Sequence, residues 1–240
     1  MARLRFKRFS DLAFLQSIDK PQYLAPLLAP FSEYFMRQGL DASNLTNDDA
    51  TDRKLLEVFT KPDEDMPGDL LALLYQLDDL ADDAGHDRIL NEVVLCGEPI
   101  DGLTGEMTCG EYAIAVYRTK PGVIQACYKK TVHRKIKNYA EFQSASGARL
   151  TLAAARRGKA ALEQALATWF DGRNRGMVCE IYPHEEGSEI RFVVTHGQTY
   201  RSEGSIDKNL KKSRVAYRPQ KHDSIIYDTQ TGIVKLNAQS

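Results

Sequence analysis

Apolar residues recur at helical spacing through the first hundred residues. Within the segment 66–90, one set follows the i, i+3, i+4, i+7 spacing of a buried helix face: Leu70, Leu73, Leu74, Leu77, Leu80, Ala81 and Ala84. Pro67 stands at the start of this stretch and Gly85 at its end, which is the usual asymmetry of helix termini. The pattern predicts a single long helix over 67–84.

Capping and breaking residues predict shorter helices on either side of it. Ser and Asp are favoured at helix N-termini, Pro interrupts helices, and a Thr followed by Glu three residues later forms a capping box. The expected caps and breaks are Ser10, Pro26, Pro30, Gly39, Asp52, and the capping box of Thr108 and Glu111. They divide the first 120 residues into several helices.

A helix is also expected in 123–143, although this stretch fits a strand nearly as well. Another is expected over 150–170, with an apolar edge of Leu162, Leu166, Trp169 and Phe170 and an end at Gly172. We expect the residues of this edge to be buried.

From Gly176 onward the spacing of apolar residues changes to two, which is typical of half-buried strands. The expected strands cover 177–182, 189–195, 198–203, 213–219, 223–228 and 233–238, and 229–232 is a hairpin loop. The expected fold class is therefore α+β, with a helical N-terminal part followed by a C-terminal, mainly antiparallel sheet. The expected domains are 1–107, acidic and helical, and 108–240, basic and α+β.

Composition narrows the class of protein only slightly. The 240 residues are 42% hydrophobic and 27% charged, and no apolar run approaches the roughly 20 residues of a membrane span. At the basic start of the chain we expect an amphipathic helix and no secretory leader. None of the four cysteines forms a CxxC pair, so we expect reduced thiols and a cytoplasmic protein, with no metal and no cofactor.

Four aspartates lie close together in the predicted long helix: Asp78, Asp79, Asp82 and Asp83. Such a cluster suggests a divalent cation, but carboxylates near a helix C-terminus repel one another, and no calcium-binding loop accompanies them. We expect a solvated acidic face or a docking face for the basic half of the chain.

Charge is divided unequally along the chain. Residues 1–120 carry 12 Lys and Arg against 22 Asp and Glu, a net charge of −10, whereas 121–240 carry 20 against 11, a net charge of +9. This asymmetry indicates either a polyanionic partner for the second half or mutual attraction between the halves, within one chain or between copies.

Two groups of residues form the candidate nucleic-acid interface. The first comprises Lys129, Lys130, Arg134, Lys135 and Lys137; the second comprises Arg201, Lys208, Lys211, Lys212, Arg214, Tyr217 and Arg218. Lys and Arg bind phosphates, and Tyr217 could stack on an unpaired base. The alternative is a solvated sheet edge, where lysines discourage strand-to-strand aggregation.

Catalytic signatures are weak. The sequence has no G-x-S-x-G elbow and no complete nuclease metal motif, whereas His196 at a strand end and Asp223 are single candidates for a hydrolase. The favoured hypothesis is a non-enzymatic accessory protein that contacts DNA or RNA through its basic half, in microbial nucleic-acid processing or defence, while its acidic half holds a protein partner or another copy. A protein–protein adaptor without nucleic-acid contact is the second hypothesis, and a hydrolase that uses His196 or Asp223 is the third.

Overall fold

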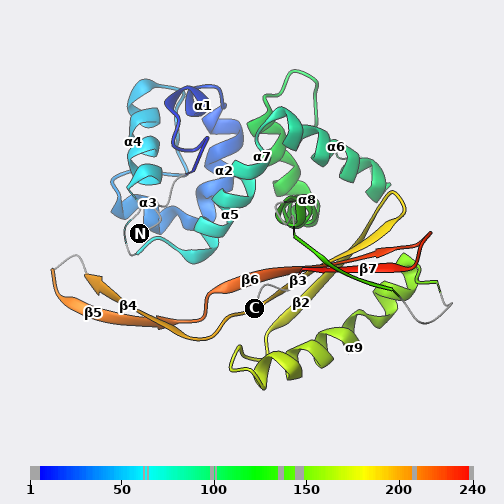
Figure 1. Cartoon of the computed structure of the whole chain (residues 1–240). Helices are drawn as coiled ribbons and strands as arrows, with labels where there is room; N and C mark the ends of the chain where they lie inside the picture. Colours follow the sequence, from blue (N-terminus) through cyan, green and yellow to red (C-terminus); the bar gives the residue numbers. More distant parts are fainter. Residues whose placement is uncertain are drawn as a thin grey trace. The chain divides into compact units, whose positions relative to one another are not determined.

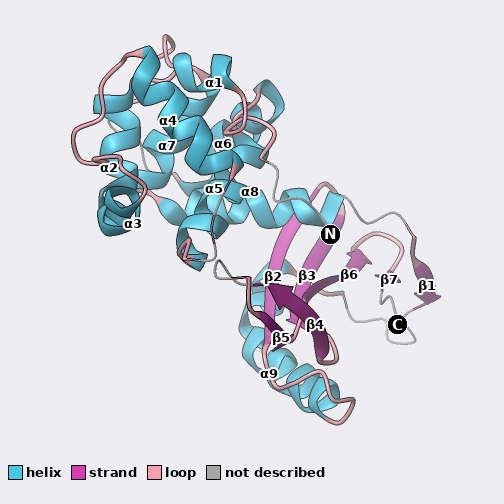
Figure 2. Cartoon of the chain, turned by 90° about the vertical axis from the view of Figure 1, so that its left-hand side faces the viewer, coloured by secondary structure: helices cyan, strands magenta, loops and turns pink. Residues whose placement is uncertain are grey.

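The computed structural model describes residues 6–61, 63, 65–97, 100, 102–134, 138–143, 149–206 and 210–237, with the side chains of 132–134 left aside. The chain divides into two compact units, Met1–Tyr128 and Lys129–Ser240, called the helical unit and the sheet unit below. Helices build the first, and antiparallel strands with a long helix build the second (Figures 1 and 2). The expected α+β class is confirmed, whereas a domain boundary after residue 107 stays a prediction.

Short helices open the helical unit and longer ones follow. They are α1 (Leu12–Gln16), η1 (Lys20–Leu24), α2 (Ala25–Leu28), η2 (Ala29–Phe31), α3 (Ser32–Arg37), α4 (Asp49–Thr60), α5 (Gly68–Leu80), α6 (Asp83–Cys96) and α7 (Cys109–Thr119). The helix α8 (Pro121–Arg134) begins in the helical unit and continues into the sheet unit. The predicted capping box opens α7, because Thr108 Oγ1 accepts from the N–H of Glu111 at 3.2 Å and Glu111 Oε2 accepts from the N–H of Thr108 at 2.9 Å.

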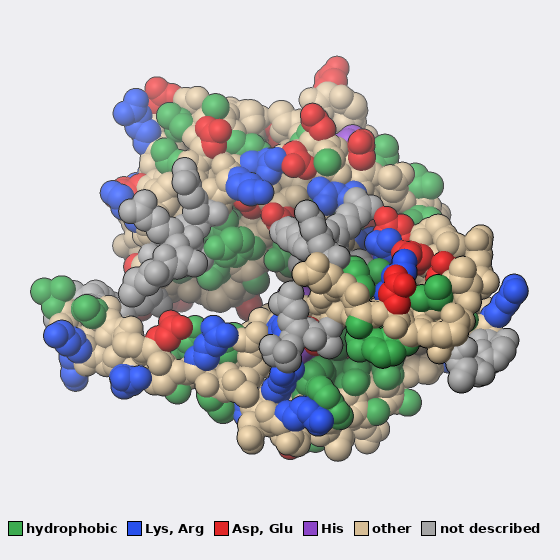
Figure 3. All heavy atoms as spheres, viewed as in Figure 1, with side chains coloured by type: hydrophobic (Ala, Val, Ile, Leu, Met, Phe, Trp, Pro, Cys, Tyr) green, Lys and Arg blue, Asp and Glu red, His purple; other side chains and the backbone are tan. Residues whose placement is uncertain are grey.

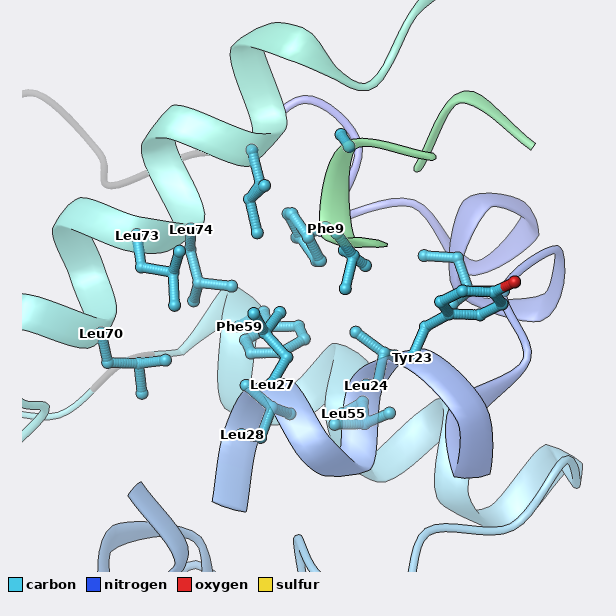
Figure 4. Close-up of a cluster of buried hydrophobic side chains, with 14 of the residues drawn as sticks. Phe9, Tyr23, Leu24, Leu27, Leu28, Leu55, Phe59, Leu70, Leu73 and Leu74 are labelled. Carbon is cyan, nitrogen blue, oxygen red and sulfur yellow. The ribbon is translucent and has the colours of Figure 1, made fainter. Parts of the chain in front are cut away.

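The predicted leucine face of α5 lies in the core of the helical unit. Leu70, Leu74 and Leu77 are fully buried, and Leu73 is 5% exposed. Figure 4 shows leucines of α5 facing Phe59 of α4 and the leucines of α2. Packing of this face holds α2, α4 and α5 together.

The single helix expected over 67–84 is in fact two helices. α5 ends at Leu80, and Asp82 takes up an extended conformation and starts α6, where its Oδ1 accepts from the N–H of Gly85 at 2.7 Å. The helical spacing of apolar residues continues from α5 into α6, so it does not reveal the break. The new helix begins at Asp82 because its side chain satisfies a free N–H there. Gly85 therefore lies inside α6 rather than at a helix end, and Ala84 is exposed.

The N-cap of α4 is Asp48, not Asp52. Asp48 Oδ1 accepts from the N–H of Thr51 at 2.8 Å, so the helix begins four residues earlier than expected. Asp52 lies within the helix, is 3% exposed, and forms an ion pair of 2.7 Å with the equally buried Lys20.

The expectation of a solvated acidic face is wrong for Asp78, which is 4% exposed. Its carboxylate accepts hydrogen bonds from the backbone N–H groups of Lys7, Arg8 and Phe9 at 2.8, 2.7 and 3.1 Å. The Arg8 guanidinium also donates to Asp82 at 2.7 Å. These two aspartates attach the segment 6–9 to α5 and α6, and Phe6 and Phe9 are thereby placed in the core.

The sheet unit contains β1 (Ala140–Gln143), α9 (Leu152–Asp171), β2 (Cys179–Glu186), β3 (Glu189–Gly197), β4 (Arg201–Ile206), β5 (Lys212–Tyr217), β6 (Gln220–Asp228) and β7 (Ile233–Asn237). Five strands form an antiparallel sheet in the order β1-β7-β6-β3-β2, and β4 pairs with β5 in a separate two-stranded sheet. The helix expected over 123–143 is thus α8 followed by the strand β1. All four residues of β1 are exposed, so the strand has no buried face.

The helix α9 packs mainly on β2 and β3, where Ala155 and Phe170 contact Ile181, Ile190 and Val194. The apolar edge predicted for this helix is only partly buried. Phe170 is 3% exposed, but Trp169 is 46% and Leu162 is 37% exposed. The spacing predicted which residues lie together along one edge of the helix. The sheet covers only part of that edge, so the other residues stay exposed.

Candidate nucleic-acid interface

The second basic group lies on a two-stranded ribbon formed by β4 and β5. The strands pair antiparallel from Arg201 opposite Tyr217 to Ile206 opposite Lys212. Every ribbon residue except Ser205 is exposed, so the ribbon has solvent on both faces. Figure 1 shows it extending from the ends of β3 and β6, as a continuation of their hairpin.

A one-residue offset separates the ribbon from that hairpin. The β3–β6 pairing ends with Gly197 opposite Gln220, whereas the ribbon starts with Arg201 opposite Tyr217. Three residues on the first strand therefore face two on the second, as in a β-bulge, which bends and twists a hairpin locally.

Arg218 holds this joint in place. Its Nη1 donates to the carbonyl of Asn174 at 2.7 Å, and its guanidinium lies 4.4 Å from the centre of the Tyr200 ring. Because these contacts fix the side chain, Arg218 has a structural role at the base of the ribbon. Arg201 also has a local contact, donating to Gln198 Oε1 at 2.9 Å.

Strand alternation sorts the ribbon side chains onto two faces, since directly opposite residues share a face. One face, called the basic face below, carries Ser202, Gly204, Ile206, Lys212, Arg214 and Ala216; the other carries Arg201, Glu203, Ser205, Ser213, Val215 and Tyr217. Two hydrogen bonds agree with this sorting. Arg214 Nε donates to Ser202 Oγ at 3.1 Å, and the Tyr217 hydroxyl donates to Glu203 Oε1 at 3.1 Å.

The basic face combines positive charge with an open surface. Among the described residues of the two strands, the one carboxylate is that of Glu203, and it lies on the face opposite Lys212 and Arg214. A Cβ added at Gly204, directly opposite Arg214, would meet no atom within 4 Å. Figure 3 shows Lys and Arg side chains along the ribbon. An extended anion could lie close against this surface without displacing a side chain.

The first basic group is only partly described. Lys129 forms an ion pair with Glu180 and lies 5.4 Å from the centre of the Tyr182 ring, both within the sheet unit. Lys130 is half-buried in α8, whereas Lys211 of the second group is exposed just before β5. Lys135, Lys137, Lys208 and the side chain of Arg134 lie outside the described residues. The contact of Lys129 with Glu180 supports an intramolecular role for this lysine.

The two residues considered for a hydrolase, His196 and Asp223, are brought together by β3 and β6. His196 Nε2 lies 2.9 Å from Asp223 Oδ2, and His196 Nδ1 lies 2.7 Å from the Gly197 carbonyl. A carbonyl oxygen only accepts, so Nδ1 donates to Gly197, and Nε2 faces the Asp223 carboxyl group.

These contacts also limit what His196 can do. The side chain is fully buried and stacks on the Phe170 ring at 3.9 Å. Because both ring nitrogens are occupied, no lone pair remains for a nucleophile. The nearest thiol on the same sheet face is Cys179, opposite His196, and burial together with Glu163 raises its pKa to about 11. The hydrolase hypothesis thus lacks an activated nucleophile at this position.

A second histidine lies on the opposite face of the sheet. His222 Nδ1 is 3.0 Å from Thr195 Oγ1. Burial is the main cause that lowers the pKa of His222 below its ordinary value, and the neighbouring His196 adds to this effect. His222 therefore favours the neutral form.

Other chemistries have little support in the described part of the chain. Its His, Cys, Asp and Glu side chains include no group of three or more that is arranged to hold a metal ion. No disulfide joins the four cysteines, all of which are described. Among the described helices, none is both long and apolar enough to cross a bilayer.

Comparison of the chain with known protein families, curated proteins and solved structures found no match.

Sequence reasoning found the charges of the ribbon but missed their arrangement. The alternation in 201–206 and 212–217 contains the necessary signal, but the sorting also requires the pairing register. The small residues Ser202, Gly204 and Ala216 were missed because they carry no charge. The pairing of His196 with Asp223 was missed because it depends on which strands are neighbours.

Proposed function

We propose that the β4–β5 ribbon binds the sugar–phosphate backbone of a nucleic acid through its basic face. The observation that carries the proposal is the sorting of Lys212 and Arg214 onto the face that also holds Ser202, Gly204, Ala216 and Ile206, with Glu203 on the other side. Phosphates attract such a surface by charge and by release of counterions. The major groove of a DNA duplex admits a two-stranded ribbon, so duplex DNA is the proposed partner.

Tyr217 stays outside the proposed contact face. Its hydroxyl donates to Glu203, and this hydrogen bond is the largest cause that raises the pKa of Tyr217. A tyrosine held in this way is not needed for backbone binding. The proposal therefore assigns affinity to charge and close approach, with no base stacking by the ribbon.

The test measures binding of a short labelled DNA duplex by fluorescence anisotropy, between about 50 and 200 mM salt. Replacing Lys212 and Arg214 by Ala should reduce the slope of log K against log salt by about 0.9 for each lost phosphate contact. Arg201→Ala is the matched control for Arg214→Ala, because it removes the same charge from the opposite face.

A second variant changes shape without changing charge. Gly204→Val places a strand-favouring side chain where a Cβ has open space, so the ribbon should keep its fold. The added methyl groups should nevertheless weaken duplex binding by holding the phosphates away. Equal losses for Arg201→Ala and Arg214→Ala, or full affinity in Gly204→Val, would refute the proposed face. Loss of self-association instead of DNA binding, seen by sedimentation, would favour an adaptor.

A further inference from the structure

A cavity of about 580 Å³ lies on the α9 face of the five-stranded sheet. Its lining comprises Ala165, Leu166, Trp169, Phe170, Arg173, Arg175, Val194, Asp223, Ile225 and Leu236. The helix α9 packs mainly on β2 and β3, and the cavity extends over β6 and β7 beside it. Figure 3 shows hydrophobic side chains gathered on this part of the sheet unit. Its volume lies within the range of small-molecule sites, and its aromatic and aliphatic walls suit a flat apolar ring.

Asp223 is the buried polar group of this cavity, with only 6% of its surface exposed. Its Oδ2 is occupied by His196, but its Oδ1 accepts no hydrogen bond from the described residues. The ammonium group of Lys221 is 3.6 Å from Oδ1. A buried acceptor without a hydrogen bond is costly, so a ligand that donates an N–H to Oδ1 would be stabilised there.

Positive charge also lines the cavity. The Arg173 guanidinium stacks over the Trp169 ring at 3.8 Å, and Arg175 is a second cationic residue of the lining. Arg175 also lines a neighbouring hollow together with Arg201 and Lys221, at the base of the ribbon. Cationic side chains thus connect the cavity to the proposed DNA-binding element.

We infer that this cavity binds a nucleotide whose base carries an exocyclic amine. The ring would lie against the apolar walls, the amine would donate to Asp223 Oδ1, and the phosphate would be attracted by Arg173 and Arg175. The inference rests on the proposed function, since the bound nucleotide would be an unpaired nucleotide at the end of the duplex that the ribbon holds. Free nucleotides carry the same base and phosphate groups, and the experiments below distinguish them from a strand.

The fluorescence of Trp169, the single tryptophan of the chain, provides a direct signal from the cavity. Titration with adenosine monophosphate should change this fluorescence saturably. The 6-deamino analogue, purine riboside monophosphate, should bind at least about tenfold more weakly because Oδ1 then stays without a donor. Equal binding of the two nucleotides, or no saturable change with either, would overturn the inference.

Two variants connect the signal to the site. Ala165→Phe narrows the exposed edge of the cavity without touching Asp223 and should abolish nucleotide binding, whereas Ala160→Phe, on α9 outside the lining, should leave it unchanged. Asp223→Ala removes the acceptor and should remove the preference for the amine. If Ala165→Phe binds adenosine monophosphate as the original chain does, the assignment to this cavity is wrong.

A short single strand of adenines separates the two sources of nucleotide. It should bind more tightly than adenosine monophosphate, and the gain should disappear in Ala165→Phe. No gain would show that the site takes free nucleotides and would overturn the link to a strand. Duplex binding by the ribbon is measured separately. If duplex binding is absent while nucleotide binding is intact, only the proposed role of the ribbon is refuted.

Discussion

At position 20, a lysine is enclosed in the helical unit with an aspartate as its partner. Lys20 and Asp52 are 2% and 3% exposed, and their ion pair of 2.7 Å joins η1 to α4. The free-energy cost of removing two charges from water offsets most of the gain from their attraction, so such a pair contributes little net stability. Removing one member is different, because the remaining charge stays buried alone.

Lys20→Met should therefore reduce the free energy of unfolding by about 3–5 kcal/mol, and Asp52→Leu by a similar amount. The double variant should recover most of the loss, since neither charge then stays buried without its partner. Urea denaturation of the four proteins gives the coupling energy. Losses that simply add in the double variant would mean that the two charges are screened by water.

At the scale of elements, the junction of α5 and α6 depends on a glycine within a helix. Gly85 lies in the first turn of α6, and a Cβ at this position would be 2.1 Å from the carbonyl oxygen of Leu80. That oxygen belongs to backbone at the end of α5, so it cannot move aside as a flexible side chain would. The close approach of the two chain segments requires the absence of a side chain.

Gly85→Ala should thus destabilise the protein, although alanine within a helix normally improves stability by roughly 0.5–1 kcal/mol. Gly158→Ala in α9 is the matched control, because a Cβ there meets nothing within 4 Å, and it should stabilise the chain. Thermal unfolding of both variants checks the opposite signs. A raised melting temperature in Gly85→Ala would contradict the packing of this junction.

Sequence patterns predicted the elements that bury one face. They failed where an element or side chain is held by residues that are far away in the sequence. Alternation identified most of the strands, and leucine spacing identified the buried face of α5. β1 was missed because its stability comes from β7, which pairs Leu236 with Ala140. Asp78 was read as solvated because its partners are backbone N–H groups, which leave no mark in a sequence. The position of each ribbon charge was predictable, but the face it occupies required the pairing register.

At the scale of the whole molecule, the charge asymmetry follows the two compact units. Residues 121–128 carry no charged side chain, so the helical unit keeps the net charge of −10 and the sheet unit the net charge of +9. The unit boundary lies within α8, where helical hydrogen bonds protect the backbone. The polar connectors of the helical unit, in contrast, lie between helices that share one core.

Limited digestion with a protease specific for acidic residues should therefore cut first in 41–51 or 97–108, where Asp and Glu occur in connecting segments. Cleavage in 97–108 should not separate the pieces under native conditions, because His86 of α6 contacts Tyr112 of α7 across the cut, with 4.4 Å between ring centres. Denaturing gels and size exclusion of the same digest distinguish cutting from release. Early cleavage within α8, or fragments that elute apart, would contradict this expectation.

The strand order has a consequence for biosynthesis. β7 lies between β1 and β6, so Ala140 cannot meet its partner until Leu236 has been synthesised. N-terminal units generally fold first on the ribosome, and the helical unit can do so while the rest of the chain is still being made. Until β7 arrives, β1 has no neighbour and the outer edge of β6 stays open. A nascent chain stalled before Ile233 would present this edge to chaperones.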